Sequence, residues 1–136
     1  MGFREENTDT PNQIQQTLPD DQPTISLNYL YEFSDGDPIF IKDMVATFIN
    51  ESPKTLEELQ LALQDKQWET VYKTAHKLKP NFMMLGMKAQ QETAATIEKI
   101  VKSKDYSNAL LPDLINQLMA AAEKAYPILR EKLQTI

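Results

Sequence analysis

Residues 68–85 read WETVYKTAHKLKPNFMML, and the spacing of their apolar side chains decides the fold. The apolar positions recur at intervals of 3, 4, 3, 4 and 3 residues, which places them on one face of an α-helix. This spacing is typical of the seam of a left-handed helical bundle. The stripe consists of Trp68, Val71, Ala75, Leu78, Phe82 and Leu85.

The segment before this helix shows the same periodicity. Residues 37–66 are predicted to form one long helix, because Asp37 is a good N-cap and Pro38 suits the first helical position. Pro53 interrupts the segment without shifting its stripe, so we expect a bend rather than two helices. The stripe is Ile41, Val45, Phe48, Ser52, Leu56, Leu59 and Leu63.

Three further helices are predicted around these two. Residues 88–103 and residues 111–133 both carry apolar residues at helical spacing, and Pro127 should bend the second of them. A short helix is expected at residues 27–33, capped by Ser26. No segment shows the alternation of a strand. The predicted fold class is therefore all-α, an antiparallel up-and-down four-helix bundle with a short additional N-terminal helix.

Composition and charge limit the class of protein. The chain has 136 residues, 41% apolar and 25% charged, which predicts one globular domain. Residues 1–24 are polar and contain three of the prolines, so we expect a flexible tail or linker there and the bundle domain at residues 25–136. The absence of cysteine, of a signal segment and of a membrane-spanning apolar run fits a cytoplasmic protein.

The net charge of −6 argues against nucleic acid as the main partner. The charge is distributed unevenly along the chain. Residues 67–88 hold four lysines and one acid, a local charge of +3, so the remainder sums to −9. A small positive face on a negative body suits the docking of a negatively charged group.

His76 is the only histidine, and it lies off the apolar stripe of the 68–85 helix. At about 100° per residue it projects about 130° from the centre of that stripe. This position favours a partly exposed imidazole over a histidine hydrogen-bonded in the core. An exposed imidazole is an effective nucleophile. Its flank on the same helix carries Tyr72, Lys73, Lys79, Pro80 and Met83.

The sequence offers no partners that would complete a catalytic site around this histidine. There is no cysteine or G-x-S-x-G motif for a hydrolase, and no second histidine for a metal site. There is also no Walker loop or kinase signature. His76 can therefore receive or pass on a group, but the chain shows no means of drawing phosphate from ATP.

The residues around His76 match the pattern of a known protein family. Residues 76–79, HKLK, followed by Leu85-Gly86, resemble the H-x-L-K-G-S-S-x-x-x-G signature of histidine-containing phosphotransfer (HPt) domains. The resemblance covers about Leu27 to Leu133. Further matches are SDGDPIF at residues 34–40, SP at residues 52–53 and DKQW at residues 65–68.

The resemblance implies a bacterial two-component phosphorelay. His76 would accept a phosphoryl group from the phosphoaspartate of a response-regulator receiver domain and pass it to another receiver aspartate. Lys79 would steady the phosphoryl oxygens, and Gly86 would be a packing position. The expected partners are receiver domains and a hybrid sensor histidine kinase. The carrier is expected to be a monomer, neither an enzyme nor a cofactor-binding protein, with Mg²⁺ supplied by the receiver.

The chain departs from the signature at Pro80-Asn81-Phe82, where the family commonly has Gly-Ser-Ser. Phe82 falls on the apolar stripe and can enlarge the core. Pro80 cannot donate a hydrogen bond to the carbonyl of His76, and an interior proline costs about 3 kcal/mol in a plain helix. We expect one helix that bends beside the phosphoacceptor. Loss of the small residue there bears on transfer rate and partner choice.

Met83 and Met87 are predicted to belong to a partner-docking patch with Tyr72, Lys73 and Pro80, since flexible methionines adapt to a partner surface. The alternatives are ordinary core packing for the methionines and a solvated helix face for the lysines. For the whole protein, the alternative is a non-catalytic helical adaptor that docks receivers without transferring phosphate. The presence of the histidine and the motif lysine favours the carrier.

Overall fold

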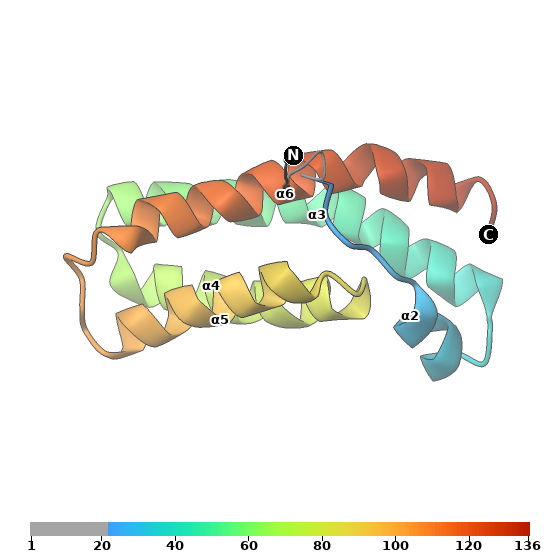
Figure 1. Cartoon of the computed structure of the whole chain (residues 1–136), viewed down its shortest axis with the longest axis horizontal. Helices are drawn as coiled ribbons and strands as arrows, with labels where there is room; N and C mark the ends of the chain where they lie inside the picture. Colours follow the sequence, from blue (N-terminus) through green and yellow to red (C-terminus); the bar gives the residue numbers. More distant parts are fainter. Residues whose placement is uncertain (1–21) are drawn as a thin grey trace, which may run out of the picture.

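The computed structural model describes residues 22–136, so the predicted tail at residues 1–24 lies almost entirely outside the described residues. Within residues 22–136 the chain is helical and has no strand, which confirms the predicted all-α class (Figure 1). The helices are α2 (Asn28–Phe33), α3 (Pro38–Gln64), α4 (Trp68–Met84), α5 (Lys88–Lys102) and α6 (Leu110–Leu133).

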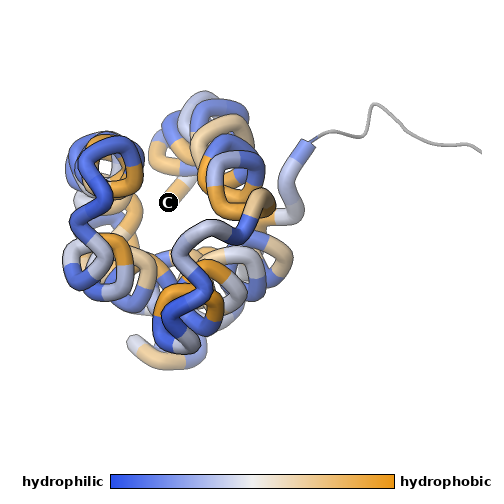
Figure 2. Tube along the Cα trace, turned by 90° about the vertical axis from the view of Figure 1, so that its left-hand side faces the viewer, coloured by the Kyte–Doolittle hydropathy of each residue, from blue (hydrophilic) through white to orange (hydrophobic). Residues whose placement is uncertain are grey.

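The four long helices form a closed ring of neighbours. Helix α3 packs against α4 and α6, and α5 also packs against α4 and α6. In Figure 1, α3 and α6 lie above α4 and α5, and the short α2 sits at one end. Seen along the bundle, the hydrophobic stretches turn toward the middle of the four long helices (Figure 2). The predicted four-helix bundle with a short additional N-terminal helix is confirmed.

Helix α3 begins as its sequence predicts. The Asp37 side chain accepts a hydrogen bond from the backbone N–H of Ile39 at 3.0 Å, and Pro38 occupies the first helical position. The helix continues through Pro53, so it is one helix as predicted. Its predicted stripe is buried except for Leu63, which is partly buried.

Gly86 fixes the turn between α4 and α5 against the N-terminal strap, the segment at residues 22–27. Its φ of +67° lies in the left-handed region, where side chains are rarely accommodated. A Cβ placed on Gly86 would lie 2.8 Å from the Cβ of Ser26, and the Ser26 N–H donates to the Leu85 carbonyl at 2.8 Å. The turn therefore needs glycine for both conformation and close approach, as its predicted packing role requires.

The remaining differences lie at helix ends. Helix α2 begins at Asn28, one residue later than predicted, and Ser26 Oγ accepts from the Asn28 N–H at 3.2 Å. Helix α3 ends at Gln64 and helix α5 at Lys102, each within two residues of its predicted end. Within residues 22–136, none of the helices combines the length and apolar character that crossing a bilayer requires.

Candidate functional site

His76 lies in the middle of α4, on the side that faces away from the bundle interior. The adjacent Ala75 and the nearby Leu78 are fully buried, whereas the His76 side chain is 63% exposed. The prediction of an exposed imidazole is confirmed, and a core histidine is excluded. A helix whose buried stripe is anchored on its neighbours holds such a side chain at a fixed place on the surface.

The imidazole is connected to the neighbouring helix by a carboxylate. His76 Nδ1 is hydrogen-bonded to Oε2 of Glu98 on α5, and Lys79 Nζ lies 2.5 Å from Oε1 of the same residue. The Glu98 side chain is only 11% exposed and that of Lys79 is 29% exposed. Both carboxylate oxygens thus have partners on α4. Together, His76, Lys79 and Glu98 form what we call the Glu98 triad.

The charge of this carboxylate follows from its contacts. Burial raises the pKa of the Glu98 carboxyl, but the hydrogen bonds and positive charges of Lys79 and His76 lower it further than burial raises it. The net pKa is below the ordinary value, so Glu98 is ionised at neutral pH. An ionised carboxylate only accepts hydrogen bonds. In the neutral form of the ring the proton is therefore on Nδ1, and Nε2 carries the free lone pair.

The other predicted surface residues lie around this ring on α4. The Tyr72 ring is nearly parallel to the imidazole, with centroids 6.1 Å apart and an angle of 10° between the planes. Lys73 is exposed and pairs with Glu69 at 3.4 Å rather than with the ring. Pro80 is exposed and Met83 is partly buried. The site is a nucleophilic nitrogen facing solvent, bordered by ammonium, aromatic and apolar groups.

A sequence model of the Hpt domain family matches residues 43–133. The chain belongs to the Hpt domain family. Hpt domains serve phosphorelays as phosphocarriers rather than kinases, and they interact with receiver domains and histidine kinases. This membership supports histidine phosphotransfer as the activity of the chain.

The fold agrees with this membership. The chain is similar to the crystal structure of histidine-containing phosphotransfer protein B (HptB) from Pseudomonas aeruginosa PAO1, with a TM-score of 0.73 and 18% sequence identity. The match covers 84% of this chain and 97% of that one. At this identity the likeness shows a shared fold. None of the curated proteins matches this Hpt domain in sequence.

One predicted docking residue of the Hpt domain needs correction. Met87 is fully buried and therefore cannot belong to a surface patch. The prediction extended the helical geometry of α4 too far. Helix α4 ends at Met84, the chain turns at Gly86, and Met87 is already the N-cap of α5, where its side chain joins the core.

The departure from the family signature is accommodated within one helix. Helix α4 runs through Pro80, which lacks the N–H that would bond the His76 carbonyl. The bend predicted there stays a prediction. Phe82 is fully buried and packs edge-on against Phe48 at a centroid distance of 5.9 Å, so it enlarges the core as expected.

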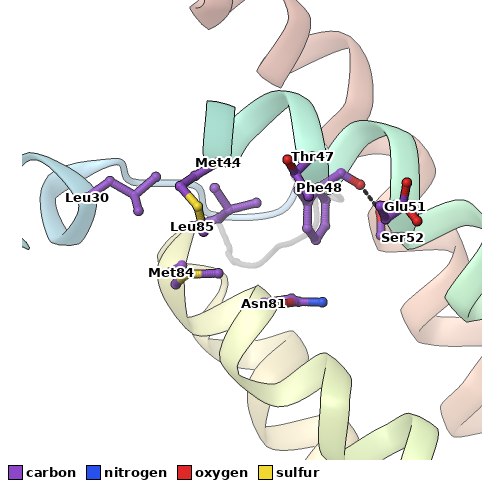
Figure 3. A pocket seen from close by; sticks show the side chains of 9 residues that line it. All are labelled: Leu30, Met44, Thr47, Phe48, Glu51, Ser52, Asn81, Met84 and Leu85. Atoms are coloured by element: carbon purple, nitrogen blue, oxygen red, sulfur yellow. Dashed lines mark hydrogen bonds between the residues drawn. The ribbon is translucent and has the colours of Figure 1, made fainter. Parts of the chain in front are cut away.

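Asn81 points into a small hollow beside the site rather than toward the imidazole. The hollow encloses about 60 Å³ between α2, α3 and α4, and Figure 3 shows Asn81 and Met84 below it with the α3 side chains above. Ligand pockets are typically about 300–1,000 Å³, and neither His76 nor Glu98 lines this hollow. Its lining residues are Leu30, Met44, Thr47, Phe48, Glu51, Ser52, Asn81, Met84 and Leu85.

Glu98 is the site residue that the sequence reasoning missed. Its signal was present, because Ala94, Ile97 and Val101 define the buried stripe of α5 and Glu98 falls within their spacing. An acid on an apolar stripe needs a charged or hydrogen-bonding partner. The lysine and histidine on the neighbouring predicted helix were the available partners. Across residues 22–136, no three His, Cys, Asp or Glu side chains form a cluster that could hold a metal ion.

Proposed function

We propose that this protein is a histidine phosphocarrier that accepts a phosphoryl group on Nε2 of His76 from a receiver phosphoaspartate and passes it to another receiver aspartate. The observation that carries this proposal is a 63% exposed imidazole whose Nδ1 is engaged by Glu98. This arrangement leaves Nε2 as the nitrogen that can reach an incoming phosphorus. Family membership supplies the class of reaction.

Each transfer step is an in-line displacement at phosphorus. The Nε2 lone pair forms the N–P bond while the bond between phosphorus and the aspartate oxygen breaks, and the electron pair leaves with the aspartate carboxylate. The second step reverses these roles on another receiver. The Mg²⁺ that neutralises the phosphoryl oxygens is proposed to arrive with the receiver domain.

Lys79 is proposed to stabilise the transferring phosphoryl group. It lies one turn after His76 on α4, and its ammonium group has three donors, of which one is directed at Glu98 Oε1. The side chain is 29% exposed, so its remaining donors can face the phosphoryl oxygens. A fixed positive charge beside developing negative charge is the main contribution a protein makes to phosphoryl transfer.

The partner surface is proposed to be the α4 flank around the imidazole, formed by Tyr72, Lys73, Pro80 and Met83. These side chains are exposed or partly buried. The flank lies within residues 67–88, which carry a net charge of +3 in an acidic chain, and this favours approach by the acidic phosphorylated site of a receiver. One feature favours the alternative function, a docking adaptor without transfer. Pro80 adds bulk beside the imidazole at the position where the family commonly has glycine.

Incubation with phosphorylated receiver domains separates the two functions. A carrier acquires an acid-labile, base-stable label that is absent in His76→Gln. The matched control is Lys77→Gln, an exposed neighbour on the same helix that should keep the label. If several phosphorylated receivers bind the protein but none labels it, the adaptor is correct and the carrier is rejected.

A further inference from the structure

We propose that Glu98 keeps a proton on Nδ1 of His76 through both transfer steps, and thereby makes the phosphorylated ring an efficient phosphoryl donor. The inference rests on the proposed function, because it concerns the state of the ring after Nε2 has been phosphorylated. Glu98 would act as a positioning residue. It contacts the ring on the side opposite the reacting nitrogen and does not touch the phosphoryl group.

The Glu98 carboxylate is held in a position that lets it accept the Nδ1 proton's hydrogen bond. Oε2 meets His76 Nδ1, and Oε1 meets Lys79 Nζ at 2.5 Å, so both oxygens are fixed by partners on α4. Only 11% of the side chain is exposed, which limits the water that could take the place of the ring. A charge-assisted hydrogen bond in such surroundings is stronger than the same bond in water.

The chemistry of the leaving group gives this contact a consequence. When neutral imidazole attacks through Nε2 and keeps its Nδ1 proton, the product is a phosphoimidazolium cation. When the N–P bond later breaks, the electron pair returns to Nε2 and neutral imidazole leaves. Without the Nδ1 proton, the ring would have to leave as an imidazolate anion, which is a much poorer leaving group. The proton moves in neither step, provided that Glu98 stabilises the cation between them.

The surroundings of the ring make this carboxylate necessary. Lys79 lies one turn away, and its ammonium charge disfavours a positive charge on the neighbouring imidazole. Lys73 is already paired with Glu69. Among residues 22–136, Glu98 is the acid seen in contact with the ring. The other titratable groups within four residues of His76 or Glu98 along the chain are Tyr72 and Lys77 on α4 and Lys99 and Lys102 on α5.

The test uses the phosphorylated protein without a partner. Phosphoramidate, a small phosphoryl donor, is used to phosphorylate the full chain on His76, and ³¹P NMR follows the phosphohistidine signal as pH is raised. The midpoint of this titration reports loss of the Nδ1 proton. Four proteins are compared: the wild type, Glu98→Gln, Glu98→Asp and the control Glu92→Gln, whose side chain is exposed on the same helix.

Glu98→Gln should lower the titration midpoint by about one pH unit or more, because an opposite charge in contact with a titrating group shifts it by one to three units. Transfer from the phosphorylated ring to a receiver should then be about tenfold slower above the lowered midpoint. Glu98→Asp keeps the charge, so its titration midpoint should lie close to that of the wild type. Glu92→Gln should titrate like the wild type.

The inference is overturned if the midpoints of the wild type and Glu98→Gln agree, or if Glu98→Asp behaves like Glu98→Gln. Failure to label the wild type with phosphoramidate also overturns it, because a free Nε2 must accept the group. A shifted midpoint without transfer to any receiver would uphold the role of Glu98 and reject the carrier function. If the wild type transfers phosphate to a receiver but the midpoint of Glu98→Gln is unshifted, the carrier function is upheld and the role of Glu98 is rejected.

Discussion

A polar link between α3 and α6 and another between α4 and α5 differ in where they end. Between α3 and α6, Ser52 donates to the Phe48 carbonyl at 2.6 Å and lies 2.7 Å from the Tyr126 hydroxyl, so the tyrosine donates to the serine. Between α4 and α5, Glu98 joins Lys79 and His76. The first link ends at a half-buried phenol, and the second ends at a 63% exposed imidazole.

The contrast separates a link that stabilises from one that also does chemistry. The Ser52–Tyr126 link is neutral, its serine is 1% exposed, and each hydroxyl proton has an acceptor within the bundle. The Glu98 triad is charged and leaves one nitrogen of the ring without a partner among residues 22–136. A bundle of this size can stabilise itself with links of the first kind. A charged link open to solvent at one atom therefore points to a function beyond its contribution to folding.

The largest effect should come from replacing one residue in each of the two links. His76→Gln is expected to abolish phosphoryl labelling while changing the free energy of unfolding by no more than about 0.5 kcal/mol, because the side chain is exposed. Ser52→Ala should do the opposite, keeping the label and losing about 1 kcal/mol. Labelling assays and urea unfolding measure both. A large loss of stability in His76→Gln would mean that both links are structural.

The next effect distinguishes two lysines on the same helix. Lys79→Ala is expected to slow transfer between receivers by about tenfold to a hundredfold, because a charge directed at the phosphoryl oxygens is lost. Lys77→Ala, which removes an exposed neighbouring charge, should change the rate less than about threefold. Rapid-quench measurement of the two rates decides the matter. Equal rates in the two variants would remove Lys79 from the mechanism.

The fold could be predicted because it depends on spacing that is visible along the chain. The 3–4 repeat of α4 and the long stripe of α3 give each helix one apolar face, and a bundle is the simplest way to bury them all. Pro53 and Pro80 did not obscure the pattern, since the stripe keeps its phase across each. The errors are at helix ends, where a turn decides the direction of the next side chain. Met87 is the clear case.

The site could be predicted on one helix but not across two. The exposure of His76 and its nearness to Lys79 follow from the geometry of α4 alone. Glu98 lies 22 residues from His76 along the chain, and its contact depends on the rotation and register of α5 against α4. Periodicity within a helix does not give that register. An acid on an apolar stripe predicts that some partner exists, and only the packed structure shows which one.

Acid should weaken the charged link selectively. The pKa of Glu98 is lower in the folded protein than its ordinary value, so the carboxylate contributes stability above about pH 4.5 that is lost as pH falls through the folded pKa. Glu98→Gln is expected to cost about 1.5–3 kcal/mol at pH 7. The difference between the wild type and Glu98→Gln should shrink as pH falls below about 4.5. Urea unfolding at a series of pH values measures it, and a constant difference would contradict an ionised, paired Glu98.

Alkali should weaken the neutral Ser52–Tyr126 link, and this is the smallest of the four predicted effects. Burial and the charge of Glu123 raise the pKa of Tyr126, although the Ser52 hydrogen bond and Arg130 oppose them. A raised folded pKa means that the phenol contributes stability up to about pH 10, which is lost as pH rises through the folded pKa. Tyr126→Phe should therefore cost about 1 kcal/mol at neutral pH and less at alkaline pH. Tyr106→Phe, at an exposed tyrosine on the α5–α6 connection, is the control. If Tyr126→Phe also slowed phosphoryl transfer, the separation between the structural and the chemical link would fail.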